Sequence, residues 1–232
     1  AFPIETVVAT ILVELELCQG SSCVLITTSI DAPDIRVAAI HSMQETYSRG
    51  KCDPNGPTVL ESPPADPSTI TFIEPMGSMH GDHITPIDHI YVKHRPDKPW
   101  DIYAMADGHI VEIGWNNATQ YRTIIEHSCD LYTIYIHIQQ LPEEIEAAAG
   151  LSPSDRGKDF QVMTRIPVKA GEVVGYDVVD GTCDYCRPQN GSLDISVVDT
   201  RVTLEGFVNP DTYAGEFWKK HCVDPFDYWK GD

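Results

Sequence analysis

From residue 69 onward the chain is a succession of short β-type segments separated by turn signals. The segment "IYAMADGHIVEIGW" (102–115) has a tight turn between two apolar runs, and "YRTIIEH" (121–127) and "LYTIYIHIQQL" (131–141) are separated only by "SCD". Closely spaced runs of this kind are typical of antiparallel sheets. The sequence therefore predicts a mainly β fold with an antiparallel sheet as its core.

The composition changes on both sides of this core. Residues 1–68 contain two β-type runs, "TILVELEL" and "VLITTS", and then a proline-rich stretch, which predicts an N-terminal β-hairpin extension and a linker. Residues 69–200 are the predicted β core, and residues 201–232 are an aromatic C-terminal clasp. Few short helices are expected, one of them over 142–150, where proline and acidic residues precede a closing glycine.

Acidic side chains dominate the charge, with 35 Asp and Glu against 16 Lys and Arg and a formal net charge of −19. This charge excludes nucleic acid and anionic membrane as expected partners, because a phosphate backbone would be repelled. No apolar run approaches the length of a transmembrane helix, so we expect no membrane insertion. The first residues lack the basic start of a signal peptide, and any targeting segment is expected to have been removed.

Seven cysteines in a chain of this length predict disulfide bonds and a secreted or extracytoplasmic location. Cys18 and Cys23 bracket the turn of the predicted hairpin, where a disulfide could join the two arms. Cys183 and Cys186 form "CDYC", for which a small disulfide loop is favoured over half a zinc site or a redox pair. The sequence alone does not pair the remaining cysteines, Cys52, Cys129 and Cys222.

The segment "MHGDHITPIDHIYVKH" (79–94) contains four of the nine histidines and two aspartates. Imidazole and carboxylate groups are the ligands that zinc takes in proteins. Two interpretations stay open at this point: a metal site, or a solvated loop that is rich in histidine.

Four segments occur in an order that resembles the LytM-type (M23) zinc metallopeptidases. They are "DIYAMADGHIVEIGW", Tyr135-Ile136-His137-Ile138, "VKAGEVVGY" (168–176) and "GSLDISVV" (191–198). The resemblance covers roughly residues 70–200 and implies an antiparallel β-sheet or barrel-sandwich core of LytM/M23 type. It also implies one bound zinc ion and peptide bonds as the substrate.

The family holds zinc partly through a His-x-x-x-Asp motif, and the matching stretch here is one residue longer, from His83 to Asp88. In a strand, this spacing puts the two side chains on opposite faces unless a bend or bulge intervenes, and Pro86 could supply the bend. His89 lies at an even spacing from His83 and is the alternative. The predicted ligand pair is therefore His83 with Asp88, or His83 with His89.

The family's last ligand lies in a His-x-His motif, and this chain has none. If Leu193, Ile195 and Val197 face the core, Ser192 and Asp194 occupy the two histidine positions. A carboxylate can bind a metal, which makes Asp194 a candidate ligand, but a serine cannot replace an imidazole at neutral pH. The expected cofactor is one divalent metal ion, zinc first. The added carboxylate suits calcium or manganese better than a histidine-rich site would, so these two metals are the alternatives.

His137 matches a catalytic histidine of the family, and Tyr135 accompanies it as a second candidate catalytic residue. Strand alternation predicts that these two side chains share one face, opposite Ile134, Ile136 and Ile138. His109, next to Gly108 in the turn, and His127, after Glu126, have weaker claims to a functional role and are expected at the surface.

Three functions are consistent with these residues. The first is an extracytoplasmic metal-binding protein that hydrolyses peptide bonds with a rearranged metal site. The second is a catalytically inactive relative that binds a surface polymer or a protein. The third is a carbohydrate-active lyase or hydrolase on the same scaffold, with His137 and Tyr135 as base and acid. For the first two functions, the expected partner is a peptide or a cell-surface polymer.

Overall fold

The structure is a computed structural model, and it describes residues 10–19, 22–31, 46–47, 51–79, 87–95, 98–116, 120–178, 192–205 and 217–230. For residues 10–31 the description concerns the backbone. His83, Cys183 and Cys186 lie outside the described residues, so the predictions made for them stay predictions.

The described chain is mainly β, as predicted, with short helices between strands. Its elements are β1 (Thr10–Gln19), β2 (Ser22–Asp31), η2 (Pro67–Thr69), β3 (Ile70–Glu74), β4 (Ile90–His94), β5 (Trp100–Tyr103), β6 (Gly108–Asn116), β7 (Gln120–Glu126), β8 (Leu131–Ile138), α2 (Glu143–Ala148), β9 (Phe160–Val168), β10 (Val173–Asp177), β11 (Ser192–Asp199), η4 (Phe217–His221), β12 (Cys222–Val223) and α3 (Pro225–Tyr228).

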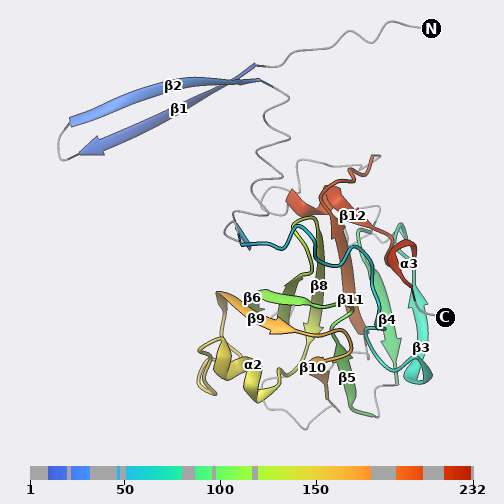
Figure 1. Ribbon diagram of the computed structural model, residues 1–232. Helices are drawn as coiled ribbons and strands as arrows, with labels where there is room; N and C mark the ends of the chain where they lie inside the picture. The colour runs from blue at the N-terminus through green and yellow to red at the C-terminus, as the bar shows by residue number, and fades with distance from the viewer. Residues whose placement is uncertain are drawn as a thin grey trace, which may run out of the picture.

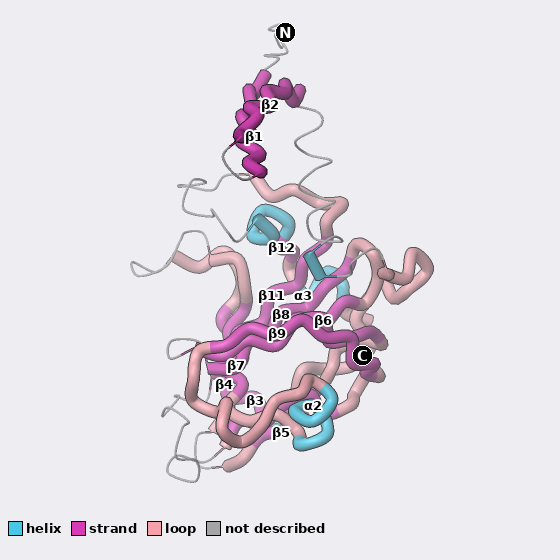
Figure 2. The backbone as a smooth tube through the Cα atoms, turned by 90° about the vertical axis from the view of Figure 1, so that its left-hand side faces the viewer, coloured by secondary structure: helices cyan, strands magenta, loops and turns pink. Residues whose placement is uncertain are grey.

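The N-terminal hairpin is confirmed, since β1 and β2 pair antiparallel and Cys18 lies opposite Cys23. A bond between these two side chains stays a prediction. The body of the molecule contains one large antiparallel sheet in the order β3-β4-β11-β8-β7-β6-β9, to which β12 adds beside β11. A second, two-stranded sheet is formed by β10 and β5 (Figure 1). Figure 2 shows α2 at one end of this body and β12 at the other.

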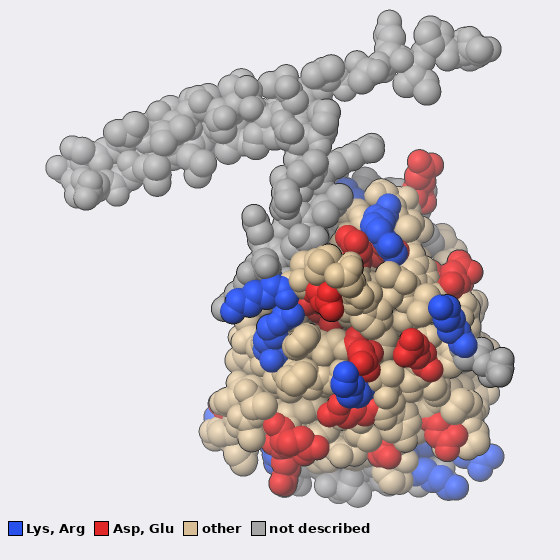
Figure 3. Space-filling model, in the orientation of Figure 1, with Lys and Arg blue, Asp and Glu red and all other residues tan. Residues whose placement is uncertain are grey.

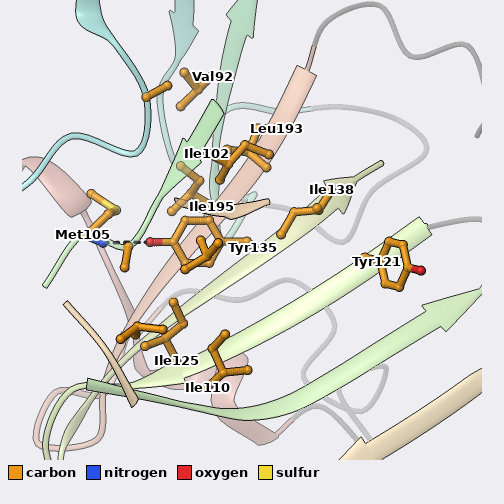
Figure 4. Packing of buried hydrophobic residues seen from close by; sticks show 14 of the residues in the cluster. Val92, Ile102, Met105, Ile110, Tyr121, Ile125, Tyr135, Ile138, Leu193 and Ile195 are labelled. Atoms are coloured by element: carbon orange, nitrogen blue, oxygen red, sulfur yellow. Dashed lines mark hydrogen bonds between the residues drawn. The ribbon is translucent and has the colours of Figure 1, made fainter. Parts of the chain in front are cut away.

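The main apolar core lies between the large sheet and the β5–β10 pair. It joins Ile102 of β5 to residues of the large sheet such as Val92, Ile125 and Ile195 (Figure 4). Val174 of β10 belongs to the same core. A smaller cluster covers the opposite, outer face of the large sheet, and its members include Val111, Ile124, Tyr132, Ile134, Val198, Trp218 and Cys222. Each central strand therefore has one row of side chains in each cluster.

Segments on both sides of residues 69–200 pack into the same main core. Leu60 and Ala65 are fully buried in it, and Val223 joins it from β12. Leu60 also forms a parallel bridge with Trp229, so the chain just before β3 lies beside the C-terminal segment. The predicted division of the chain into 1–68, 69–200 and 201–232 stays a prediction, and residues from all three segments contribute to the main core.

A disulfide joins Cys52 to Cys129 across 77 residues of sequence. It ties the chain before β3 to the turn between β7 and β8, and disulfides of this kind persist in oxidising compartments. No helix in the described part of the chain is long and apolar enough to span a membrane. On the face shown in Figure 3, acidic and basic side chains lie among one another.

A buried contact between a histidine and a carboxyl group connects the two sheets. His94 of β4 donates from Nδ1 to the Arg95 carbonyl at 2.9 Å, and its Nε2 lies 2.5 Å from Asp177 Oδ2 on β10. The imidazole stacks on Trp100 of β5, with ring centroids 4.2 Å apart. This contact between β4, β5 and β10 holds the small sheet against the large one.

The expectation that His127 lies at the surface is wrong, because its side chain is 3% exposed. Nδ1–H donates to the Asp107 carbonyl at 2.9 Å, and Nε2 lies 2.8 Å from the Thr133 hydroxyl, which can donate to it. Gly56 packs so closely on the His127 carbonyl oxygen that an added Cβ would lie 2.2 Å away. Burial is the main cause that lowers the pKa of His127 to about 4.

We predict that His127 makes the fold sensitive to acid. Its pKa is lower in the folded protein than in the unfolded chain, so its contribution is complete above about pH 6.5 and is lost as the pH falls toward 4. Between pH 7 and pH 4.5 the loss from this group amounts to about 2–3 kcal/mol. Urea unfolding of the native protein and of His127→Gln at pH 7 and at pH 4.5 measures this loss in the free energy of unfolding. Equal losses in the two proteins would contradict the prediction.

Candidate functional site

The candidate site lies on the outer face of the large sheet and is set by the alternation of β11. Leu193 and Ile195 point into the main core, as predicted, and Asp194 between them points outward. In the sheet register Asp194 lies opposite Tyr91 of β4 and opposite Ile136 of β8. Its side chain is nevertheless only 8% exposed. A carboxylate is thus buried at the centre of three strands.

His89 precedes β4 and turns its imidazole toward this carboxylate. Its Nε2 lies 3.7 Å from Asp194 Oδ2, and its Nδ1 lies 2.9 Å from Asp88 Oδ1. Burial acts to raise the pKa of Asp88, but the His89 hydrogen bond and the nearby Lys219 ammonium outweigh it and hold that pKa below its usual range. Asp88 is therefore ionised and accepts a hydrogen bond from His89 Nδ1–H, and His89 Nε2 is the ring nitrogen directed at Asp194.

His137 reaches Asp194 through a bulge in β8. Tyr121 and Arg122 pair with Ile138 and Ile136, so His137 is an extra residue in its strand, with a φ of +74°. Its Nε2 lies 3.3 Å from Asp194 Oδ2, and its side chain is 21% exposed, more than that of His89 or Asp194. His137 is therefore the imidazole of this group that is most open to solvent.

The bulge also changes the predicted strand alternation. Ile134 lies in the outer cluster as expected, but Ile138 joins Tyr135 in the main core, because the extra residue reverses the phase beyond it. The prediction that Ile138 faces away from Tyr135 is wrong for this reason.

Tyr135 is fully buried and is not brought to His137. Its hydroxyl accepts from the Met105 backbone N–H at 3.1 Å (Figure 4). It donates to the Tyr103 carbonyl at 3.2 Å. Burial, as the largest cause, raises the pKa of Tyr135 well above its usual value. This hydroxyl joins β8 to the chain that follows β5.

The sequence did not point to Lys219, which the structure adds to the site. It lies in η4, outside the segments that resemble the family, and its Nζ is 3.6 Å from Asp88 Oδ2. Its side chain is 16% exposed. In "FWKKH" nothing distinguishes Lys219 from the exposed Lys220, so only the fold could reveal which ammonium turns inward.

The cluster contains the donor types of a zinc site. Within the described part of the chain, no group donates a hydrogen bond to Asp194 Oδ1, which is buried. The 3.7 Å between His89 Nε2 and Asp194 Oδ2 is near the roughly 3.3–3.5 Å that separates two ligand atoms of tetrahedral zinc. Among the described residues no three His, Cys, Asp or Glu side chains are arranged to hold a metal ion, and the predicted ligand His83 lies outside them.

A separate apolar groove lies on the other side of β4. It has a volume of about 370 Å³ and is lined by Ile90 and Val92 of β4, by Ile73 of β3, and by Phe226 and Trp229 of the C-terminal segment. Phe226 is 55% exposed. The groove and the Asp194 cluster face opposite sides of the same strand.

No family model matches this chain, and no curated protein matches it. Several solved structures are similar to it, among them these three. The SpoIIQ–SpoIIIAH pore-forming complex has a TM-score of 0.48 at 12% identity, with 74% of this chain and 92% of that chain covered. A zinc-containing peptidase from Vibrio cholerae has a TM-score of 0.45 at 15% identity, with 76% and 41% covered. Helicobacter pylori Csd3 has a TM-score of 0.44 at 15% identity, with 76% and 34% covered, so the chain spans about a third of that protein.

We predict that the backbone at His137 is strained. A residue with a side chain in the left-handed region costs about 1–2 kcal/mol, and glycine avoids most of this cost. His137→Gly should therefore be more stable than His137→Ala by about 1 kcal/mol, measured by urea unfolding. The same pair of substitutions at Thr71, exposed in β3, is the control, where alanine should be the more stable. Alanine as the better residue at both positions would contradict the prediction.

Proposed function

We propose that this protein binds one divalent metal ion, preferably zinc, at the Asp194 cluster and hydrolyses peptide bonds of an extracytoplasmic peptide or surface polymer. One observation carries the proposal: a buried carboxylate faces the Nε2 atoms of His89 and His137, and Oδ1 of that carboxylate accepts no hydrogen bond from the described chain. A buried carboxylate oxygen that accepts no hydrogen bond is stabilised by a bound cation.

The proposed ligands are His89 Nε2 and the Asp194 carboxylate, together with His83 as predicted from the sequence. Of the two alternatives for the second position, the contacts favour His89 over Asp88. Asp88 accepts from His89 Nδ1–H, and a carboxylate behind a metal-binding imidazole fixes the ring and raises its basicity. Zinc is preferred because imidazole nitrogen and carboxylate oxygen together suit it, whereas calcium takes oxygen ligands.

His137 is the proposed general base and acid. When bound, zinc would supply Lewis acidity for activating water and polarising a carbonyl group. The half-buried imidazole of His137 can accept a proton on Nε2 from the attacking water, and the negative charge of Asp194 at 3.3 Å stabilises the imidazolium that results. The same nitrogen can then donate that proton to the leaving amine. Ser192, at the position of the family's other catalytic histidine, cannot share this role.

The disulfide between Cys52 and Cys129 supports the extracytoplasmic location in this proposal.

We expect the protein purified without chelator to contain about one zinc ion per chain, measured by elemental analysis. His89→Ala and Asp194→Ala should lose the metal, and His109→Ala, outside the cluster, should retain it. Free zinc at about 100 times its Kd should stabilise the native fold by about 2.7 kcal/mol, and a chelator should abolish this stabilisation. No metal in the native protein, together with no stabilisation by added zinc, would contradict the proposal.

His137→Ala separates catalysis from metal binding. It should retain zinc and lose hydrolysis of glycine-rich or cell-wall peptides. Unchanged hydrolysis in this variant would remove His137 from the mechanism.

A second candidate is a non-catalytic module that binds a surface polymer or a partner protein. The apolar groove beside β4 favours it, since an open groove with exposed Phe226 offers area for a partner. Phe226→Ser would weaken this binding and leave zinc content unchanged. A carbohydrate-active mechanism with His137 and Tyr135 as base and acid gains no support, because the Tyr135 hydroxyl is bonded inside the core.

A further inference from the structure

Lys219 belongs to the C-terminal segment, yet its ammonium group lies beside the Asp194 cluster. Ile195 of β11 pairs with Ile90 at the start of β4, and Val197 pairs with Val223 at the end of β12, on the same edge of the strand. The end of β12 is therefore followed along this edge by the start of β4. Lys219 lies in the 3-10 turn that leads into β12, and its Nζ is 3.6 Å from Asp88 Oδ2.

The fold keeps this ammonium in a low-exposure position, where an unpaired charge would be costly. Lys219 is 16% exposed and Asp88 is 7% exposed, with Nζ 3.6 Å from Oδ2. At this separation a unit charge pair is worth several times more than in bulk water, because little solvent screens it. The neighbouring Lys220 is exposed and is held by its backbone carbonyl, which accepts from Leu204 N–H at 2.7 Å.

The two oxygens of Asp88 face different partners. Oδ2 faces Lys219, and Oδ1 accepts from His89 Nδ1–H. Oδ2 accepts no hydrogen bond from the described chain and is attracted to the Lys219 charge at 3.6 Å, so rotation of the carboxylate would weaken this attraction or break the Oδ1 hydrogen bond. The orientation of the carboxylate therefore decides which nitrogen of His89 carries the proton and which one faces Asp194.

We propose that Lys219 is a positioning residue of this site: it holds Asp88 in place, and Asp88 in turn fixes the His89 ring with Nδ1 protonated and Nε2 directed at Asp194. A permanent positive charge from the C-terminal segment thus takes part in a site where Ser192 stands at the position of the family's other catalytic histidine. The inference rests on the proposed function, because it concerns the same site, but its test uses metal-free protein.

The test is the tautomer of neutral His89, read from its ring ¹⁵N chemical shifts at pH 8 in metal-free protein and assigned with His89→Gln. In the native protein Nδ1 should be protonated and Nε2 should not. Lys219→Met should reduce this preference to a mixture of the two tautomers. Lys219→Arg should restore it, and Lys220→Met should leave it at the native value.

Lys219→Gln removes the charge with a polar side chain and replaces Lys219→Met if that variant does not fold. If His89 keeps its native tautomer in folded Lys219→Met or Lys219→Gln, the inference is overturned. It is also overturned if Lys220→Met shows the same mixture of His89 tautomers as the Lys219 variant. Absence of zinc binding in the native protein would contradict the proposed function, while the tautomer result would still decide the role of Lys219.

Discussion

The alternation of β11 is the constraint on which the site depends. Leu193, Ile195 and Val197 fill the main core between the two sheets, and this burial places Asp194 on the opposite face. A slip of one residue in the register would expose three apolar side chains and bury the carboxylate in the core. The same strand pairs with β8 on one edge and with β4 and then β12 on the other, so it gathers every element that carries the cluster around Asp194.

Charge and backbone strain are concentrated around this carboxylate. His137 arrives by an extra residue in a left-handed conformation, which the pairing of β8 with β7 and β11 holds in place. Asp88, on the other side, is balanced by Lys219 and turns His89 inward. The cluster contains two carboxyl groups, Asp88 and Asp194, and one ammonium group, Lys219. A divalent cation would therefore meet a site that attracts it.

Much of the fold and part of the site could be predicted from the sequence. The wrong or missing predictions have identifiable physical reasons. Alternating apolar residues located the strands, the hairpin and the phase of β11, because periodicity reports which face is buried. The same alternation gave the wrong face for Ile138, because nothing in "YIHIQQL" marks a bulge at His137. His127 seemed a surface residue by its polarity, but Asp107 and Thr133 satisfy its ring inside the fold. The sequence could not predict the role of Lys219, because Asp88, which it contacts, lies more than a hundred residues away in the sequence.

Anomalous diffraction at the zinc edge, from crystals of the native protein grown with zinc, tests the central claim most directly. The account predicts one strong peak within about 2.0–2.2 Å of both His89 Nε2 and an Asp194 carboxylate oxygen, with Asp88 still bound to His89 Nδ1. A peak coordinated by Asp88 in place of His89, or no peak near Asp194 in zinc-saturated crystals, would contradict it.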